Sequence, residues 1–454
     1  MENINREHPE YIARKRMWKQ YKDLYAGGEQ FRLHASDYLM CRHKEPGPIY
    51  QERLSRVFYQ NYIGSIIDWF AATLMHCPPV LMFEGNDAAA KDFYSLLYND
   101  CDLKGTSLPE FFRQRFVQTA VCGSSYIVVD FPRTTGAARS RAEEDASGQS
   151  RAYLVDYGPE EVINWNFNET GVLEWIVIRT SCLQQSQVTD AKWESETRWV
   201  YYDRENFRIY RKTAESSPIQ LIDQGRHALA SLDRVPVFKV KVTEGLWLMN
   251  KSALLQLEHF NKSNALAWAL TMGLFATPVI YSDREWNQIA GESYYIQMGP
   301  NDRFGWAEPE GKVYQIAADN LDVLKDEIYR VCYLMSQAGA GNSTRQSALS
   351  KQLDFSTTEE VLRAYGDAVK ETLRQILWAV AAARQDGVTI DVVGMDEFDI
   401  NDLGTELGDA TQLLALGIGS ETLKKQVFKK LALKYLSDER QEIKNRVAEE
   451  IDNQ

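Results

Sequence analysis

The chain has 454 residues, of which 44% are hydrophobic and 25% charged, and its formal net charge is −13. This length predicts more than one folding unit, and the composition is that of a folded soluble protein. The acidic balance argues against broad, sequence-independent binding of nucleic acid, which needs a surplus of Lys and Arg on one face. It does not exclude nucleic acid passing close to the protein, because an acidic wall repels phosphate and so prevents the nucleic acid from sticking.

Cysteine usage and apolar runs bear on the compartment. The 6 cysteines form no CxxC pair, which favours reduced thiols in a cytoplasmic setting. The N-terminus lacks the apolar core of a signal peptide. The most apolar run, residues 66–83, contains Asp68, His76, Pro78 and Pro79, so the sequence predicts no transmembrane segment.

The N-terminal half divides into a helical and a β-rich part. Residues 1–130 are mainly helical, and the predicted segments are 11–25, 64–75, 88–98 and 108–121, followed by a buried strand at 126–130. Residues 134–150 form a polar insert typical of an exposed loop. From residue 152 to 242 the apolar period is two, which predicts strands at 153–156, 173–180, 198–202, 207–212 and 237–241.

A helix and a small mixed segment come next. Asn250 is a predicted N-cap for a helix that reaches Phe275, and a strand starts at Thr277. Residues 282–320 are mixed, with candidate strands at 294–298 and 313–316. Apolar residues at spacings of three and four then predict a second helix: Leu321, Leu324, Ile328, Val331 and Met335.

A polar break at residues 339–347 separates this helix from a longer one. The longer helix is marked by a second apolar series: Leu362, Val369, Leu373, Ile376, Leu377 and Val380. Residues 356–359 (STTE) have the form of a capping box, so we expect this helix to begin or bend at Ser356. Gly387 ends it, a strand is predicted at 388–393, and the tail from 405 to 451 is helical, with caps at Ser420 and Ser437.

Catalytic motifs are weak or missing. Residues 339–344 superficially resemble a phosphate loop, but Asn342 and Ser343 stand where that loop needs Lys and Ser/Thr. Residues 399–410 fail as a calcium loop because Ala410 holds the place of the bidentate Glu. No histidine pair signals zinc and no GxSxG elbow exists. Residues 122–125 (CGSS) are a tight turn rather than a nucleophile site. The sequence therefore predicts no catalytic residue, metal or cofactor.

The order of the parts resembles the portal proteins of tailed double-stranded DNA phages. Three sequence segments are similar to one portal subfamily, namely HPEY at 8–11, AYLVDYGPEEVINW at 152–165 and ATPVI at 276–280. The glycine-containing break near residue 340 is similar as well. The resemblance spans most of the chain, and the insert at 134–150 and the short tail fit it least.

This resemblance implies an α+β, mainly helical portal fold with the following parts. They are a wing (1–249), a first stem helix (250–275), a clip (276–318), a second stem helix (319–338), a tunnel loop (339–347), a long helix with a return strand to the wing (348–402) and a helical crown (403–454). It also implies a homo-oligomeric ring of about twelve subunits around a central channel.

The function implied by the resemblance is structural and not enzymatic. The ring would stand at one capsid vertex of the virion, after assembly in the host cytoplasm, and genomic double-stranded DNA would be packaged and ejected through it. Implied partners are the terminase large subunit, then head-completion and tail adaptor proteins, and the major capsid and scaffolding proteins, with no membrane.

Two sets of residues are candidate sites. The tunnel-loop set is Gly341, Asn342, Ser343, Thr344, Arg345 and Gln346, in which Arg345 is the only charge and is expected to approach the DNA backbone. The channel-facing stem set lies at spacings of three and four: Asp319, Asp322, Asp326 and Arg330. Two alternatives stay open, a virion structural or adaptor protein without a DNA channel, and a soluble enzyme with a dispersed active site.

The C-terminal tail carries a basic series whose role has two interpretations. Its members are Lys424, Lys425, Lys429, Lys430 and Lys434. One interpretation is a solvated charged face opposite Leu423, Val427 and Leu431. The other is contact with phosphate or with an acidic neighbouring subunit.

Overall fold

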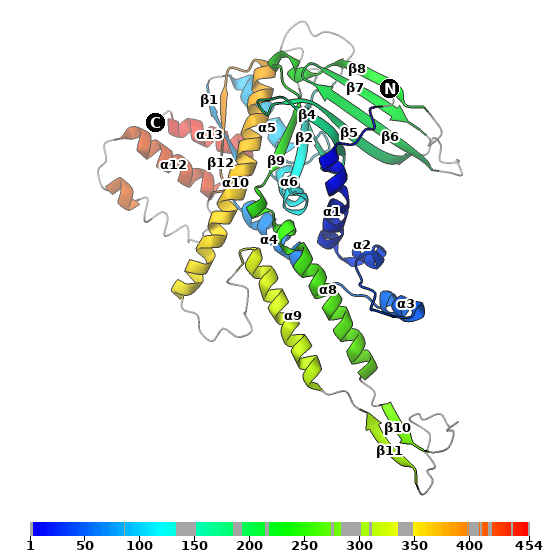
Figure 1. The fold of residues 1–454 in the computed structure, drawn as a ribbon. Helices are drawn as coiled ribbons and strands as arrows, with labels where there is room; N and C mark the ends of the chain where they lie inside the picture. Colours follow the sequence, from blue (N-terminus) through cyan, green and yellow to red (C-terminus); the bar gives the residue numbers. More distant parts are fainter. Residues whose placement is uncertain are drawn as a thin grey trace. The chain divides into compact units, whose positions relative to one another are not determined.

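The computed structural model of the chain describes most of its residues (Figure 1). These are residues 3–85, 87–132, 151–184, 193–213, 218–273, 277–282, 301–307, 311–334, 348–396, 398, 408, 411–415, 420–436 and 439–452. Over this range the chain is an α+β protein. The chain forms two compact units. Unit 1 consists of Met1–Lys22, Ser65–Lys251 and Gln346–Gln454, and unit 2 consists of Asp23–Gly64 and Ser252–Arg345.

Unit 1 contains most of the strands. Its strands are β1 (Val80–Glu84), β2 (Ser124–Asp130), β3 (Tyr153–Tyr157), β4 (Val162–Phe167), β5 (Leu173–Gln184), β6 (Glu194–Asp203), β7 (Asn206–Lys212), β8 (Gln220–Arg226), β9 (Val237–Lys241) and β12 (Thr389–Val393). All the ladders between them are antiparallel. They form a five-stranded sheet in the order β4-β5-β6-β7-β8, a three-stranded sheet in the order β3-β2-β9, and the pair β1-β12.

The helices of unit 1 pack mainly against the two smaller sheets. They are α5 (Ala88–Asn99), α6 (Leu108–Cys122), α10 (Ala348–Arg384), α12 (Glu421–Tyr435) and α13 (Gln441–Asp452), with short 3-10 turns η2 (Ala228–Leu232) and η3 (Glu244–Leu246). The division between the units falls inside α1 (Pro9–Ala26), α4 (Tyr62–Leu74) and α8 (Leu248–Gly273). α10 packs against β9, β12 and η2, and α6 packs against β2.

The core of unit 1 is mainly apolar. One cluster joins the inner faces of the two larger sheets, and its fully buried members include Val128, Val162 and Ile178. A second cluster stacks aromatic rings edge to face: Tyr365 meets Phe70 at 5.7 Å and Phe116 at 5.0 Å between ring centroids. Burying such rings is a large favourable term in folding. The Tyr365 hydroxyl donates to the carbonyl oxygen of Leu246 at 2.5 Å, so its polar group is satisfied.

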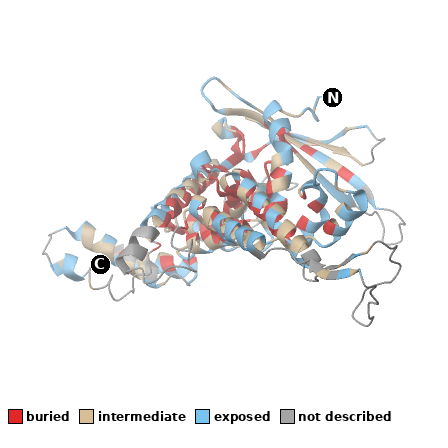
Figure 2. Cartoon of the chain, turned by 60° about the horizontal axis from the view of Figure 1, so that its bottom comes forward, coloured by how far each residue is buried: buried red, intermediate tan, exposed pale blue. Residues whose placement is uncertain are grey.

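The C-terminal helix α13 is fixed to this unit by side chains. Gln441 Nε2 donates to the carbonyl oxygen of Leu81 at 2.9 Å, and Lys91 forms an ion pair with Glu449 at 2.5 Å. The described residues of α12 are mostly half-buried or exposed. In Figure 2 the described ribbon near the C-terminus is likewise mainly pale blue and tan. Lys429 of the basic series is nevertheless 9% exposed, so a fully solvated lysine face is wrong at this position.

Unit 2 is built on two long helices, α8 and α9 (Gly311–Val331). Between them in the chain stand β10 (Thr277–Tyr281) and β11 (Arg303–Ala307), which pair antiparallel and project from one end of the helices (Figure 1). The remaining elements are α2 (Gly28–Leu33), η1 (Ala35–Asp37) and α3 (Gly47–Ser55). Residues 23–64 thus belong with α8 and α9, whereas the sequence boundary at 249 grouped them with the wing.

Several sequence predictions are confirmed. Helices occur at the four N-terminal segments, and strands occur at all five positions predicted between 152 and 242. The apolar series of α10 is buried at every predicted position, with 0–1% exposure. Gly123 ends α6 with φ of 83° and β2 begins at Ser124, which confirms the turn at 122–125. The Ser420 cap is confirmed because its Oγ accepts from Leu423 N–H at 3.2 Å.

Other predictions are wrong. Residues 313–316 are not a strand but the first turns of α9, which begins at Gly311. Asn250 is not an N-cap, because α8 starts at Leu248 and the Asn250 side chain accepts from the Tyr21 hydroxyl at 3.0 Å. α10 starts at Ala348, so Ser356 does not begin it, and the alternative that α10 bends at Ser356 stays a prediction. The sequence prediction also missed β1, β4, β8, β11, α2 and α3.

Some predictions lie outside the described residues. They are the insert at 134–150, the strand at 294–298, the break at 339–347 and the Ser437 cap. Within the described residues, no helix combines the length and the apolar character needed to span a membrane.

Candidate functional site

The candidate site is the helix pair α8–α9 of unit 2. Lys262 Nζ of α8 donates to Asn320 Oδ1 of α9 at 2.9 Å, and the Tyr314 hydroxyl of α9 donates to the carbonyl oxygen of Ala269 at 3.5 Å. The residue number of the α9 partner falls from 320 to 314 as that of α8 rises from 262 to 269, so the two helices run antiparallel. Figure 1 shows them side by side along their length.

α9 presents three different faces. The face centred on Ile328, which is 0% exposed, includes the half-buried Leu321 and Leu324 of the predicted apolar series. At about 100° per residue, Ile316 and Val323 lie about 120–140° from Ile328 in one rotational sense. Asp322 and Asp326 lie about 120–160° from it in the other sense. A buried, an apolar and an acidic face therefore share one helix.

The apolar face is open to solvent. Its exposed members are Val313 (64%), Ile316 (60%) and Val323 (63%). We call these three residues the α9 stripe. Sequence reasoning missed the stripe because its first two members were placed in a strand. The signal that could have found it is their recurrence at positions 313, 316 and 323, which is a helical spacing.

The predicted stem residues all lie on α9 and away from its buried face. Asp319, Asp322 and Arg330 are exposed and Asp326 is half-buried. Asp319 Oδ1 accepts from Gln315 Nε2 at 2.8 Å. The Arg330 guanidinium donates two hydrogen bonds to the Glu327 carboxylate, at 2.5 and 2.6 Å, and these bonds lower the pKa of Glu327. The structure thus brings the predicted residues to one side of the helix, with Arg330 neutralised by its neighbour.

The tunnel-loop residues Gly341, Asn342, Ser343, Thr344, Arg345 and Gln346 lie outside the described residues. Among the described residues, no group of three or more His, Cys, Asp or Glu side chains is placed to hold a metal ion.

Amide side chains of α8 hold the N-terminal segments of unit 2. Gln256 accepts from Ile63 N–H at 3.3 Å and donates to the Gln60 carbonyl at 2.7 Å. Asn264 accepts from Phe58 N–H at 3.1 Å and donates to the Phe58 carbonyl at 2.9 Å. Backbone N–H and carbonyl groups of an extended segment have no partner within that segment. Each side-chain amide therefore supplies both a hydrogen-bond acceptor and a donor for them.

A third amide repeats this arrangement one turn away. Asn261 accepts from Met40 N–H at 2.8 Å and donates to the Tyr38 carbonyl at 3.1 Å. The sequence prediction missed these roles, because helical periodicity does not mark which amides are buried. The available signal was the cluster of three amides within one helix of otherwise mixed character.

An aromatic cluster lies under the same segments. Phe31 stacks on Tyr59 at 4.1 Å and meets Phe260 edge-on at 4.9 Å. The Tyr59 hydroxyl donates to the Leu24 carbonyl at 2.9 Å, and burial raises the pKa of Tyr59. Burial, and then a hydrogen bond to Asp23, raise the pKa of Tyr38 as well. Both phenols stay neutral and act as hydrogen-bond donors.

A histidine is buried between α8 and its neighbours. His259 is 2% exposed, and its ring meets Tyr62 edge-on at 5.0 Å. Burial lowers the pKa of His259; Asp322 opposes this effect and Lys325 adds to it. Its Nδ1 is buried and has no hydrogen-bond partner among the described residues. The neutral ring is therefore the form that suits the folded state.

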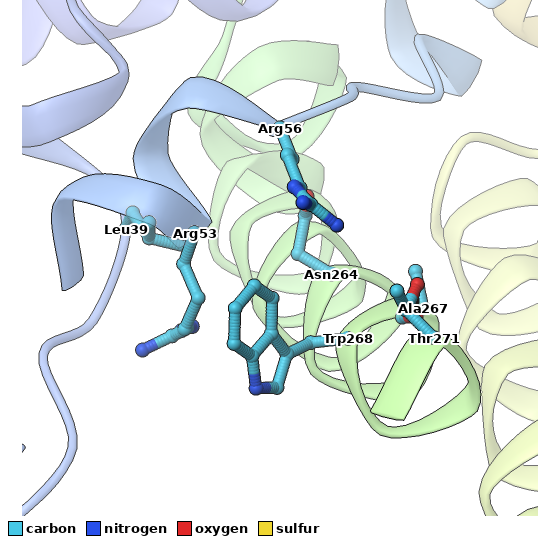
Figure 3. Close-up of a pocket in the computed structure, with 7 residues that line it drawn as sticks. All are labelled: Leu39, Arg53, Arg56, Asn264, Ala267, Trp268 and Thr271. Atoms are coloured by element: carbon cyan, nitrogen blue, oxygen red, sulfur yellow. Dashed lines mark hydrogen bonds between the residues drawn. The ribbon is translucent and has the colours of Figure 1, made fainter. Parts of the chain in front are cut away.

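A small cleft opens between α3 and α8 (Figure 3). Its volume is about 80 Å³, and it is lined by Leu39, Arg53, Arg56, Asn264, Ala267, Trp268 and Thr271. Arg53 is held by Glu45 in a buried ion pair at 2.6 Å, and this contact lowers the pKa of Glu45. The Arg56 guanidinium lies 5.8 Å from the centre of the Trp268 ring, within cation–π range.

Comparisons with known proteins do not assign a family. No family model matches the sequence, and no curated protein sequence matches it. Among solved structures, a chain of "Virion of native gene transfer agent (GTA) particle" matches with a TM-score of 0.39 and 12% identity, covering 86% of this chain and 94% of that chain.

Two further structures give similar values. A chain of "Neck of empty GTA particle computed with C6 symmetry" has a TM-score of 0.40 and 11% identity, with 78% of this chain and 85% of that chain covered. A chain of "Neck of native GTA particle computed with C12 symmetry" has a TM-score of 0.38 and 11% identity, with 78% and 84% covered. At these values the matches carry no conclusion about function.

Proposed function

We propose that this chain is a portal-type virion subunit. In this proposal, copies of the chain form a ring at one capsid vertex, and genomic double-stranded DNA passes through the channel during packaging and ejection. The ring serves as the docking site for the terminase large subunit and later for head-completion and tail proteins. The chain performs no chemistry in this role.

The α8–α9 pair carries the proposal. Two long antiparallel helices with a strand pair between them fit a stem that ends in a clip. β12 pairs with β1 in register from Val80↔Val393 to Glu84↔Thr389, which fits a strand returning from the long helix α10 to the wing.

The faces of α9 support a place in a ring. An exposed acidic face suits the wall of a DNA channel, because like charge prevents the polyanion from adhering. We assign Asp322 and Asp326 to this wall, with Asp319 at its edge beside the α9 stripe and Arg330 paired to Glu327. The exposed α9 stripe leaves a second, apolar face for a neighbouring subunit.

The break at residues 339–347 completes the proposal. Gly341, Asn342, Ser343, Thr344 and Gln346 offer backbone and side-chain hydrogen bonds to phosphate, and Arg345 offers the one positive charge. We propose that Arg345 contacts the DNA backbone as it moves. A contact with the phosphate backbone does not depend on the base sequence of the DNA, so it can act along the whole genome.

Mass measurement of the purified full-length chain tests the ring directly. We expect closed rings of about twelve copies, with an open channel in single-particle images along the symmetry axis. A monomer at all concentrations, or a compact dimer without a channel, would contradict the proposal. A monomer with metal-dependent turnover would instead favour a soluble enzyme.

The loop is tested separately in particles. Arg345→Ala and Arg345→Glu variants are compared with wild type for the amount of DNA packaged and retained. We expect Arg345→Glu to lose more than Arg345→Ala, because it adds repulsion to the lost contact. Normal packaging and retention by both variants would remove Arg345 from the mechanism without affecting the ring.

A further inference from the structure

The α9 stripe is an exposed apolar surface of unit 2. Three β-branched side chains on one helix face, each at least 60% exposed, are more than the single scattered apolar residues of an ordinary surface. Removing them from water would be favourable. The question is which surface covers them.

Ring geometry restricts the answer. In a ring of more than two copies, neighbouring subunits meet head to tail, so two different surfaces of the same chain face each other. The α9 stripe therefore cannot pack on the α9 stripe of the next copy. Its partner must be another surface of unit 2 or unit 1.

The cleft between α3 and α8 is placed for this role. On α8, Asn264 and Trp268 lie about 130° around the helix from Lys262 and Ala269, the residues that contact α9. Figure 1 shows α3 and α9 on different sides of α8. The cleft thus faces away from α9, whereas the stripe lies about 20–60° around α9 from Asn320. The stripe and the cleft are separate surfaces of one unit, as a head-to-tail contact requires.

The size and chemistry of the cleft favour a protein side chain. At about 80 Å³ it is far smaller than the cavities of roughly 300–1,000 Å³ that hold small-molecule ligands. Leu39, Ala267 and the Trp268 ring supply apolar walls, as Figure 3 shows. A single aliphatic side chain fits this description better than a cofactor does.

The charges are complementary. The Arg56 side chain is 55% exposed at the rim of the cleft, where Glu52 and Trp268 hold it. On α9, the exposed Asp319 stands one turn after Ile316 and so flanks the stripe. An aliphatic residue in the cleft would bring such a carboxylate near Arg56.

We infer that the cleft of one subunit receives the α9 stripe of the next, with Ile316 against Trp268 and Asp319 facing Arg56. The inference rests on the proposed ring and names its subunit interface. Ile316 acts as the apolar anchor, and the ion pair selects the register.

The test uses full-length protein and measures ring formation against subunit concentration by mass photometry. We expect Ile316→Glu to raise the concentration needed for rings by about tenfold or more, since it buries a charge at an anchor position. Leu254→Glu is the matched control, because Leu254 is 76% exposed on α8 but lies about 20 Å along the helix from Trp268. Far-UV circular dichroism confirms that both variants remain folded.

A charge exchange tests the register independently of the anchor. Asp319→Arg alone and Arg56→Asp alone should each weaken assembly, and the double variant should recover most of the loss. If wild type forms rings and Ile316→Glu assembles as well as Leu254→Glu, the inference is overturned while the proposed function stands. If wild type forms no ring, the proposed function itself fails.

Discussion

The apolar cluster between the sheets of unit 1 buries nine residues, none of them charged, whereas α8 in unit 2 buries Ser252, Gln256, His259, Ser263 and Asn264. The first arrangement depends on volume and shape, and it tolerates many combinations of apolar residues. The second depends on individual hydrogen bonds, because each buried amide must meet its own backbone partner. The comparison teaches that, in unit 2, polar contacts as well as packing fix the position of the N-terminal segments on α8.

Truncation in the core of unit 1 should have the largest effect. Phe116 is 1% exposed and meets Tyr365 at 5.0 Å between ring centroids. We expect Phe116→Ala to lower the free energy of unfolding by about 3–5 kcal/mol, because it leaves a cavity and removes a ring contact. Chemical denaturation measures the change, with Leu96→Ala, at a 57% exposed position of α5, as the control. A loss below about 1 kcal/mol would mean that the site collapses without strain.

Removing one of the three amide side chains of α8 that bond the N-terminal segments should lower stability by an intermediate amount, and the change should be confined to unit 2. Asn264→Leu keeps the side-chain size but leaves the Phe58 N–H and carbonyl without their partner. We expect a loss of about 1–3 kcal/mol, the usual cost of unsatisfied buried groups. Hydrogen exchange should become faster in residues 56–60 and in adjoining α8, with Leu254→Ala as an unperturbed control. Unchanged exchange there would show that packing, not the amide, holds the segment.

The smallest effect should come from pH. Because burial lowers the pKa of His259 below its ordinary value of 6.5, the unfolded state binds the proton more readily than the folded state. The stability that depends on a neutral His259 is therefore complete above that value and is lost as the pH falls below it. After correction for the intrinsic pH dependence of exchange, we expect lower amide protection factors in α8 and α9 at pH 5.5 than at pH 8, and a smaller difference in His259→Phe. The same difference in both proteins would assign the pH response to other groups.

Local periodicity was sufficient for the elements with a clear buried face. The spacing of Leu362, Val369, Leu373 and Ile376 predicted α10, and all four are buried at 0–1% exposure. The period of two between 152 and 242 predicted five strands correctly. These elements place most of their apolar residues on one side, with exceptions such as the 60% exposed Trp378 of α10, so the sequence carries the pattern of the buried face.

Residues with a pattern unlike their final environment misled the prediction. Val313 and Ile316 are β-branched, and β-branched residues favour strands, but their side chains stand exposed on a helix. β1 was hidden because Val80–Glu84 directly follows two prolines and pairs with a strand more than 300 residues away in the chain. No local spacing encodes such a partner.

By itself, the sequence determined the fold class, the long helices, most of the β-rich part and the absence of a recognisable catalytic motif. It also placed Asp319, Asp322, Asp326 and Arg330 on one helix face, and the structure agrees. Only the tertiary structure decided that residues 23–64 join α8 and α9, that three amides hold them there, and that α9 has an exposed apolar face. The physical reason is that helical and strand periods depend on neighbours in the chain. Amide partners and exposed faces depend instead on which distant segments meet.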